Sequence, residues 1–100
     1  MPHLICYDIA NNNLRTRLAA KIAAAGFDRI NKSVYLGTVS DRSLAILQAW
    51  LQKQMQTKAQ EGDCLIILPV TTQQVQRMLV LGTDQTDREE LTGSKNTIFI

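Results

Sequence analysis

The sequence has few cysteine, histidine and aromatic residues, and it contains no long hydrophobic run. Two cysteines among 100 residues are too few for an iron–sulfur cluster, a cysteine-based zinc site or a disulfide framework. The longest apolar run, Leu65–Val70, is far shorter than the ~20 residues of a membrane span. The start, Met1-Pro2-His3, carries no Lys or Arg and leads directly into patterned sequence, so no secretory signal is predicted. We therefore expect a small, soluble, cytoplasmic domain without membrane contacts.

The same scarcity excludes several kinds of catalytic and binding site. His3 is the single histidine, and the sequence has no Ser-His-Asp, Cys-His or HExxH arrangement and no glycine-rich phosphate loop. Aromatic residues make up 5% of the chain, too few for the base-stacking platform of an RNA-recognition sheet. We expect Cys6 and Cys64, which stand in apolar runs, to be buried as small hydrophobic side chains.

The net charge of +2 is unevenly distributed along the chain. Residues 1–60 hold eight Lys or Arg and three Asp or Glu, whereas residues 61–100 hold three Lys or Arg and six Asp or Glu. A basic body with an acidic tail is compatible with a polyanion partner, since Lys and Arg neutralise phosphates. Charge alone nevertheless favours an ordinary solvated surface.

Apolar runs and helical repeats alternate along the chain. The pattern predicts two helices, the first ending at Gly26 with an apolar stripe of leucines and Ile22, and the second beginning at Ser40 with Ile46 and Trp50 widening its stripe. Strands are predicted at 3–9, 27–30, 33–39 and 64–70, although 27–39 can also be read as one bent strand. The order β-α-β-β-α-β predicts an α+β, ferredoxin-like sandwich with helices on one face of the sheet.

The last third of the chain is predicted to add a pair of strands. A short helical turn at 71–76 precedes a strand at 78–81, and an apolar strand at 97–100 follows the acidic segment 83–93. We expect a ferredoxin-like domain at 1–82, with an acidic linker and a dimerisation strand at 83–100. An apolar C-terminal strand is suited to pairing with a sheet edge, so a homodimer is predicted.

Asp8 stands at the C-terminal end of the first predicted strand, directly before a helix. This position suits a ligand-binding carboxylate and a loop-capping residue equally well. Mg²⁺ is held by one or two carboxylates together with substrate phosphates and waters. A homodimer would supply a second Asp8 across its two-fold axis, so a metal nuclease on this chain requires dimerisation.

Several short motifs together resemble the Cas2 family of small CRISPR-associated, nuclease-like proteins of spacer acquisition. They are Tyr7-Asp8-Ile9, Arg15-x-Arg17 with Lys21 and Gly26, the run from Arg29 to Gly37, and the strand-like segment from Asp63 to Val70. The resemblance covers about residues 3–82. The chain departs from it at Asn31, where Gln is usual, at Tyr35, where Phe is usual, and at Leu36, where a polar residue is common.

The resemblance implies a ferredoxin-like homodimer in which the two Asp8 carboxylates share one Mg²⁺ or Mn²⁺ ion. It implies a metal-dependent endonuclease that acts on single-stranded RNA or double-stranded DNA, in the cytoplasm of a prokaryote. It also implies the central dimer that bridges two dimers of a CRISPR integrase during spacer acquisition, as part of antiviral defence. Two alternatives stay open: a non-catalytic DNA-binding scaffold, and a related toxin ribonuclease outside CRISPR.

The resemblance also assigns roles to seven residues. Asp8 is expected to be both the catalytic residue and the metal ligand. Three arginines are expected to contact nucleic-acid phosphates: Arg15, Arg17 and Arg29. Three further residues are expected to shape the cleft: Tyr7, Ser33 and Tyr35.

Overall fold

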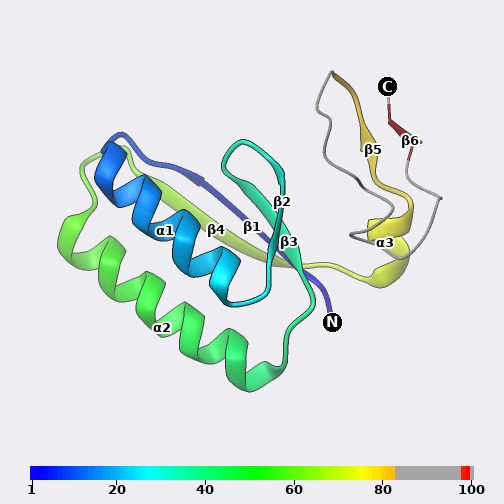
Figure 1. Cartoon of the computed structure of the whole chain (residues 1–100), viewed down its shortest axis with the longest axis horizontal. Coiled ribbons are helices and arrows are strands. Elements are labelled where there is room, and N and C mark those ends of the chain that lie inside the picture. The colour runs from blue at the N-terminus through cyan, green and yellow to red at the C-terminus, as the bar shows by residue number, and fades with distance from the viewer. Residues whose placement is uncertain (83–97, 100) are drawn as a thin grey trace.

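A computed structural model of the chain describes residues 1–82 and 98–99. Four antiparallel strands form a sheet in the order β2-β3-β1-β4, and the two long helices cover one of its faces (Figure 1). The elements are β1 (His3–Asp8), α1 (Asn12–Ala24), β2 (Asp28–Asn31), β3 (Val34–Gly37), α2 (Asp41–Lys58), β4 (Cys64–Pro69), α3 (Thr72–Gln76), β5 (Leu79–Val80) and β6 (Ile98–Phe99). Among the described residues, none of the helices is long and apolar enough to cross a membrane.

Helix α1 forms where its capping residues and apolar stripe predict it. The Asn11 side chain accepts a hydrogen bond of 2.8 Å from the backbone N–H of Leu14, which satisfies a free donor of the first turn. Gly26 follows the helix with φ +109°, a left-handed conformation that L side chains rarely adopt. The buried stripe consists of Leu14, Leu18 and Ile22.

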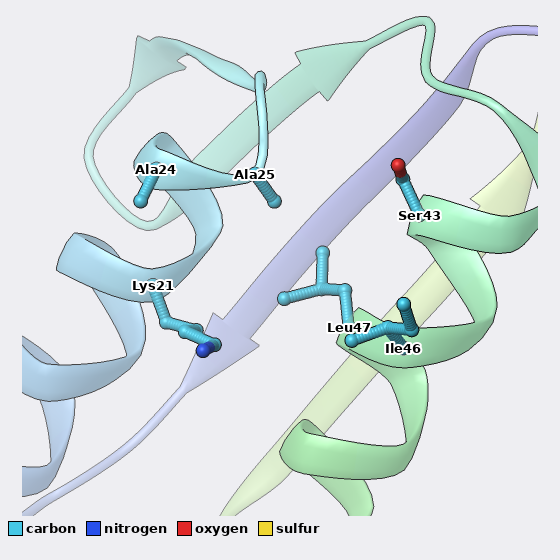
Figure 2. Close-up of a pocket in the computed structure, with 6 residues that line it drawn as sticks. All are labelled: Lys21, Ala24, Ala25, Ser43, Ile46 and Leu47. Atoms are coloured by element: carbon cyan, nitrogen blue, oxygen red, sulfur yellow. The ribbon is translucent and has the colours of Figure 1, made fainter.

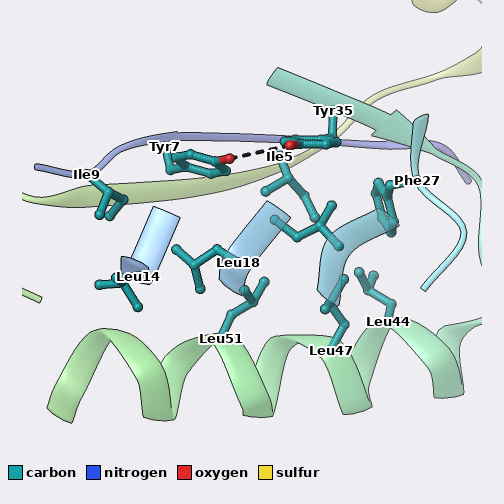
Figure 3. Close-up of a cluster of buried hydrophobic side chains, with 11 residues drawn as sticks. Ile5, Tyr7, Ile9, Leu14, Leu18, Phe27, Tyr35, Leu44, Leu47 and Leu51 are labelled. Atoms are coloured by element: carbon teal, nitrogen blue, oxygen red, sulfur yellow. Dashed lines mark hydrogen bonds between the residues drawn. The ribbon is translucent and has the colours of Figure 1, made fainter. Parts of the chain in front are cut away.

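Helix α2 lies beside α1 and buries a narrower stripe than predicted. Leu44, Leu47 and Leu51 point toward the sheet and complete the main core (Figure 3). The prediction that Ile46 widens this stripe is wrong, because its side chain is 59% exposed. At ~100° per residue, Ile46 is turned ~200° from Leu44, so it lies outside the arc that faces the sheet.

The segment after Gly26 forms two separate strands and not one bent strand, the two alternatives that the sequence left open for residues 27–39. β2 and β3 pair as an antiparallel hairpin with a bulge between Arg29 and Asn31. Ser33 closes the turn with φ 63°, a left-handed conformation that is uncommon for residues other than glycine. The Asn31 side chain accepts a hydrogen bond of 2.8 Å from the backbone N–H of Lys32 and supports this turn.

The two faces of the sheet have different surroundings. The face toward α1 and α2 carries the core, whereas the opposite face, here called the open face, carries Leu4, Cys6 and Asp8 of β1 and Cys64, Ile66 and Leu68 of β4. Over β2 and β3, Val75 of α3 packs with Ile30 and Leu36 on the open face. On β4, at the opposite edge of the sheet, Ile66 and Leu68 are 52% and 50% exposed. The prediction that both cysteines are buried is wrong: Cys6 is half-buried and Cys64 exposed, because α3 packs on another part of this face and the two long helices lie on the opposite one.

The predicted C-terminal strand pair is present. β5 and β6 pair in parallel, with Leu79 opposite Ile98 and Val80 opposite Phe99. Before β5, the predicted short helical turn forms α3, whose Thr71 and Gln74 make a reciprocal capping box. The predicted acidic linker at 83–93 lies outside the described residues.

Candidate active site and nucleic-acid interface

The Asp8 carboxylate lies on the open face of the sheet. Side chains alternate between the two faces of a strand, and Tyr7 and Ile9 are both buried against the helices. Asp8 between them therefore points the other way, where it is exposed. Its register partner on β4 is Cys64.

A second carboxylate, that of Asp63, lies next to this end of the sheet, although no role was predicted for it. One of its oxygens accepts from the backbone N–H of Ala10 at 3.0 Å, and the other from the backbone N–H of Gln60 at 2.8 Å. Asp63 thereby joins the turn before β4 to the end of β1, 53 residues apart. These two hydrogen bonds hold the backbone beside Asp8 in place.

Asp8 fits a hard divalent cation as one ligand of a larger set. Carboxylate oxygen is the ligand type that Mg²⁺ prefers, and Mg²⁺ usually keeps several waters beside one or two carboxylates and substrate phosphates. Within residues 1–82 and 98–99, no three His, Cys, Asp or Glu side chains come together. A second copy of the chain and a bound phosphate would have to supply the remaining protein and substrate oxygens.

Tyr7 and Tyr35 lie together on the helix-covered face. Their hydroxyl oxygens are 3.4 Å apart, and their rings stack at a centroid distance of 6.0 Å (Figure 3). Burial raises the pKa of Tyr7 to about 12, and the Tyr35 hydroxyl adds to the rise, whereas Ser33 and Arg29 lower the pKa. Both the burial and the pKa keep the Tyr7 phenol protonated at neutral pH, available as a hydrogen-bond donor.

Around this tyrosine pair the chain forms a small cavity, here called the basic pocket. Its volume is about 160 Å³, and its lining residues are Tyr7, Arg15, Thr16, Ala19, Arg29, Lys32, Ser33 and Tyr35. The structure therefore brings together five of the seven predicted site residues. Lys32 joins them although no role was predicted for it: the turn that places it beside Arg29 was not evident from the sequence.

The remaining two predicted residues lie elsewhere. Asp8 is on the opposite face of the sheet, so one chain does not form a cleft that contains both the carboxylate and the tyrosine pair. Arg17 is exposed on the other flank of α1, where it donates a long hydrogen bond of 3.5 Å to Gln54 of α2. Arg15 and Arg17 thus lie on opposite sides of the apolar stripe, as helical spacing predicts.

A second hollow lies between α1 and α2 and differs in chemistry (Figure 2). Its volume is about 290 Å³, and Lys21 is the one charged residue among those that line it. The Lys21 ammonium lies 5.4 Å from the centre of the Trp50 ring, a cation–π contact that holds it along the helix surface. The other lining residues are apolar apart from Ser43. This hollow therefore offers little for a phosphate.

A known protein family and an individual protein resemble this chain in sequence. The sequence profile of the family described as CRISPR associated protein Cas2 matches residues 1–78. The CRISPR-associated endoribonuclease Cas2 1 of Archaeoglobus fulgidus is 29% identical over 70 residues, which are 70% of this chain and 71% of that protein. The match to the family spans the four-stranded sheet and every candidate site residue.

Two crystal structures resemble the fold. That of Streptococcus pyogenes Cas2 aligns with a TM-score of 0.69 and 18% identity, over 82% of this chain and 100% of that one. That of a hypothetical protein from Thermus thermophilus aligns with a TM-score of 0.59 and 26% identity, over 70% of this chain and 80% of that one.

Proposed function

The chain belongs to the Cas2 family of CRISPR-associated proteins, and on that premise we propose that it works as a homodimer that binds nucleic acid during spacer acquisition and hydrolyses phosphodiester bonds through Asp8. The named relative is an endoribonuclease, which supports nuclease chemistry at the level of the family. The proposed place of action is the prokaryotic cytoplasm. The observation that carries the proposal is the exposed Asp8 carboxylate at the end of the open face.

The open face supports the homodimer. Ile66 and Leu68 expose about half of their apolar side chains on the same face as Asp8. Contact between two such faces across a two-fold axis would bury these side chains and bring the two Asp8 carboxylates toward one another. The strand order β2-β3-β1-β4 with two helices on one face is that expected of a ferredoxin-like sheet, and the part of the other face that α3 leaves uncovered is free for this contact.

The hydrolytic role follows from the charge of the carboxylates. When bound, Mg²⁺ or Mn²⁺ supplies an activated water and offsets negative charge that develops on the phosphate oxygens. Asp8 from each chain would hold the ion by an oxygen atom, and the exposed position leaves room for the phosphate of a bound strand. The arginines Arg15, Arg17 and Arg29 would hold the strand by its phosphates.

One observation also favours the non-catalytic alternative, a scaffold that holds duplex DNA for a CRISPR integrase. Three of the cationic side chains surround the basic pocket, which lies on the face opposite Asp8. Nucleic acid bound in that pocket would lie on the other side of the sheet from the Asp8 of the same chain. Such a scaffold would need the cations and the dimer but no hydrolysis. A toxin ribonuclease outside CRISPR would share the Asp8 chemistry and lack the integrase.

Cleavage assays with purified protein separate these functions. Labelled single-stranded RNA and double-stranded DNA are incubated with the wild type, Asp8→Asn and the control Asp41→Asn, in Mg²⁺ and in EDTA. The nuclease function predicts cleavage that needs Mg²⁺, survives Asp41→Asn and is lost in Asp8→Asn. Wild-type protein that never cleaves but co-purifies with an integrase would contradict the nuclease function and support the scaffold.

A further inference from the structure

The basic pocket has an unusual balance of charge and hydrogen-bond donors. Arg15, Arg29 and Lys32 give it three positive charges, and none of the described residues that line it is Asp or Glu. Four hydroxyl groups stand among them, from Tyr7, Thr16, Ser33 and Tyr35. A pocket lined by cations and hydroxyls, with no carboxylate to neutralise them, offers hydrogen-bond donors and positive charge to an anionic ligand.

The size of the pocket restricts what that anion can be. Its volume of about 160 Å³ lies below the ~300–1,000 Å³ of pockets that enclose whole small molecules. Since a water molecule takes ~30 Å³ of liquid volume, the pocket has room for about five waters. One phosphate group fits this space, which is too small to enclose a whole nucleotide.

Two of the three cationic side chains are held in place before any ligand arrives. Arg15 donates to the carbonyl oxygen of Ile9 at 3.0 Å and also to the Asn12 side chain, so its guanidinium is fixed at the start of α1. Arg29 donates through Nε to the carbonyl oxygen of Asn31 at 3.3 Å, which leaves its terminal nitrogens directed outward from that contact. Fixed donors lose little conformational freedom on binding.

The backbone of Ser33, which lines the pocket, is held in a strained conformation. Ser33 has φ 63°, and it is the one non-glycine residue with positive φ among those described. Its backbone carbonyl accepts from the N–H of Tyr7 at 3.1 Å, which ties the turn to β1. Residues held in sparsely populated conformations concentrate at binding sites, where surrounding contacts fix them.

From these observations we propose that the basic pocket binds a phosphate monoester, the group that ends a phosphorylated nucleic-acid strand. A monoester carries nearly two negative charges and three terminal oxygens, whereas an internal phosphodiester carries one charge and two such oxygens. Three cations and several hydroxyls match the monoester better. The proposal rests on nucleic-acid binding as the function of this chain but not on Asp8, which lies on the other face of the sheet.

The first experiment uses inorganic phosphate as the probe, at constant ionic strength and in EDTA. Amide chemical shifts are followed by NMR in the wild type and in two pocket variants, Lys32→Ala and Ser33→Gly. The glycine variant removes the hydroxyl and suits the left-handed turn, so the fold is retained. Lys53→Ala, an exposed lysine of α2 outside the pocket, is the matched control. We expect saturable shifts at residues 31–35, with affinity reduced roughly tenfold in Lys32→Ala and unchanged in Lys53→Ala.

The second experiment compares oligonucleotides of one sequence with a 5′-phosphate, a 3′-phosphate or only hydroxyl ends. We expect a phosphorylated end to bind roughly tenfold more tightly than hydroxyl ends, and Lys32→Ala to remove that difference. Equal affinity for all three oligonucleotides would overturn the monoester assignment, and absence of any phosphate-dependent shift would overturn the pocket itself. Either failure leaves cleavage by Asp8 untouched, because no metal or hydrolysis enters these measurements.

Discussion

Tyr7 and Asp8 are adjacent in sequence but leave β1 on opposite faces of the sheet. The Tyr7 side chain is 9% exposed and lies in the core under α1, whereas the Asp8 side chain is exposed on the open face. Strand geometry requires this separation, since successive side chains alternate. The chain therefore carries the basic pocket on one side of the sheet and its candidate metal ligand on the other.

The first prediction concerns the dimer. Replacing Ile66 with Lys places a charge in the middle of the proposed interface, where about half of the ~1.5–3 kcal/mol for full burial of an Ile side chain would be lost in addition to the cost of burying the charge. We expect Ile66→Lys to be folded but monomeric by light scattering. Ile46→Lys is a close control, because Ile46 is 59% exposed on α2 and Ile66 is 52% exposed. A dimer of wild-type stability in Ile66→Lys would rule out the open face as the interface.

The second prediction concerns the binding of nucleic acid. Contacts to phosphates release counterions, so log K falls with log salt concentration by ~0.9 per phosphate contact on B-DNA. We expect Arg29→Ala to reduce this slope by about one contact per chain. Arg42→Ala, which removes an exposed arginine outside the basic pocket, should leave the slope unchanged. An affinity that does not depend on salt in the wild type would contradict binding through phosphates.

The sequence was sufficient for the elements whose signals are local. The Asn11 cap, the stripe of Leu14, Leu18 and Ile22, and the stop at Gly26 predict α1 nearly to the residue, because caps and helical spacing act within a few positions. The same holds for Pro69 at the end of β4. The order of the first six elements along the chain, β-α-β-β-α-β, also agrees with the prediction.

The sequence was insufficient to predict burial in a strand whose residues are all apolar, because the two faces of such a strand cannot be told apart by polarity. Cys64 stands in such a strand, and it is exposed because it lies on the face opposite the two long helices, outside the part that α3 covers. Similarly, a strand at 3–9 implies that the Tyr7 and Asp8 side chains diverge, but not which of them faces the helices. The basic pocket depends on a left-handed serine in a turn, and neither β-propensity nor charge predicts that Ser33 adopts this conformation.

The third prediction concerns the buried phenol. The pKa of Tyr7 is about 12 in the folded chain against 10.0 for a free tyrosine, so between these values the folded state binds more protons than the unfolded state. The stabilisation that the Tyr7 phenol contributes is therefore complete below pH 10 and is lost as the pH rises toward 12. The free energy of unfolding falls by about 2 kcal/mol at pH 11.5 from this cause. We expect Tyr7→Phe to lose this part of the alkaline destabilisation, as measured by urea unfolding at pH 8 and pH 11.5. An identical pH dependence in both proteins would show that Tyr7 does not titrate in this way.

The last prediction concerns the charge of Asp8 in the dimer and does not depend on cleavage. If the open faces meet, the two carboxylates repel each other in the absence of metal, and a shared divalent cation removes that repulsion. We expect Mg²⁺ to tighten dimerisation of the wild type by roughly tenfold relative to EDTA. Asp8→Asn removes both charges, so its dimer should be tighter than the wild type in EDTA and insensitive to Mg²⁺. Asp41→Asn, on the first turn of α2, should respond to Mg²⁺ as the wild type does. Sedimentation equilibrium at constant ionic strength measures all three proteins, and a wild-type dimer that ignores Mg²⁺ would remove Asp8 from any shared metal site.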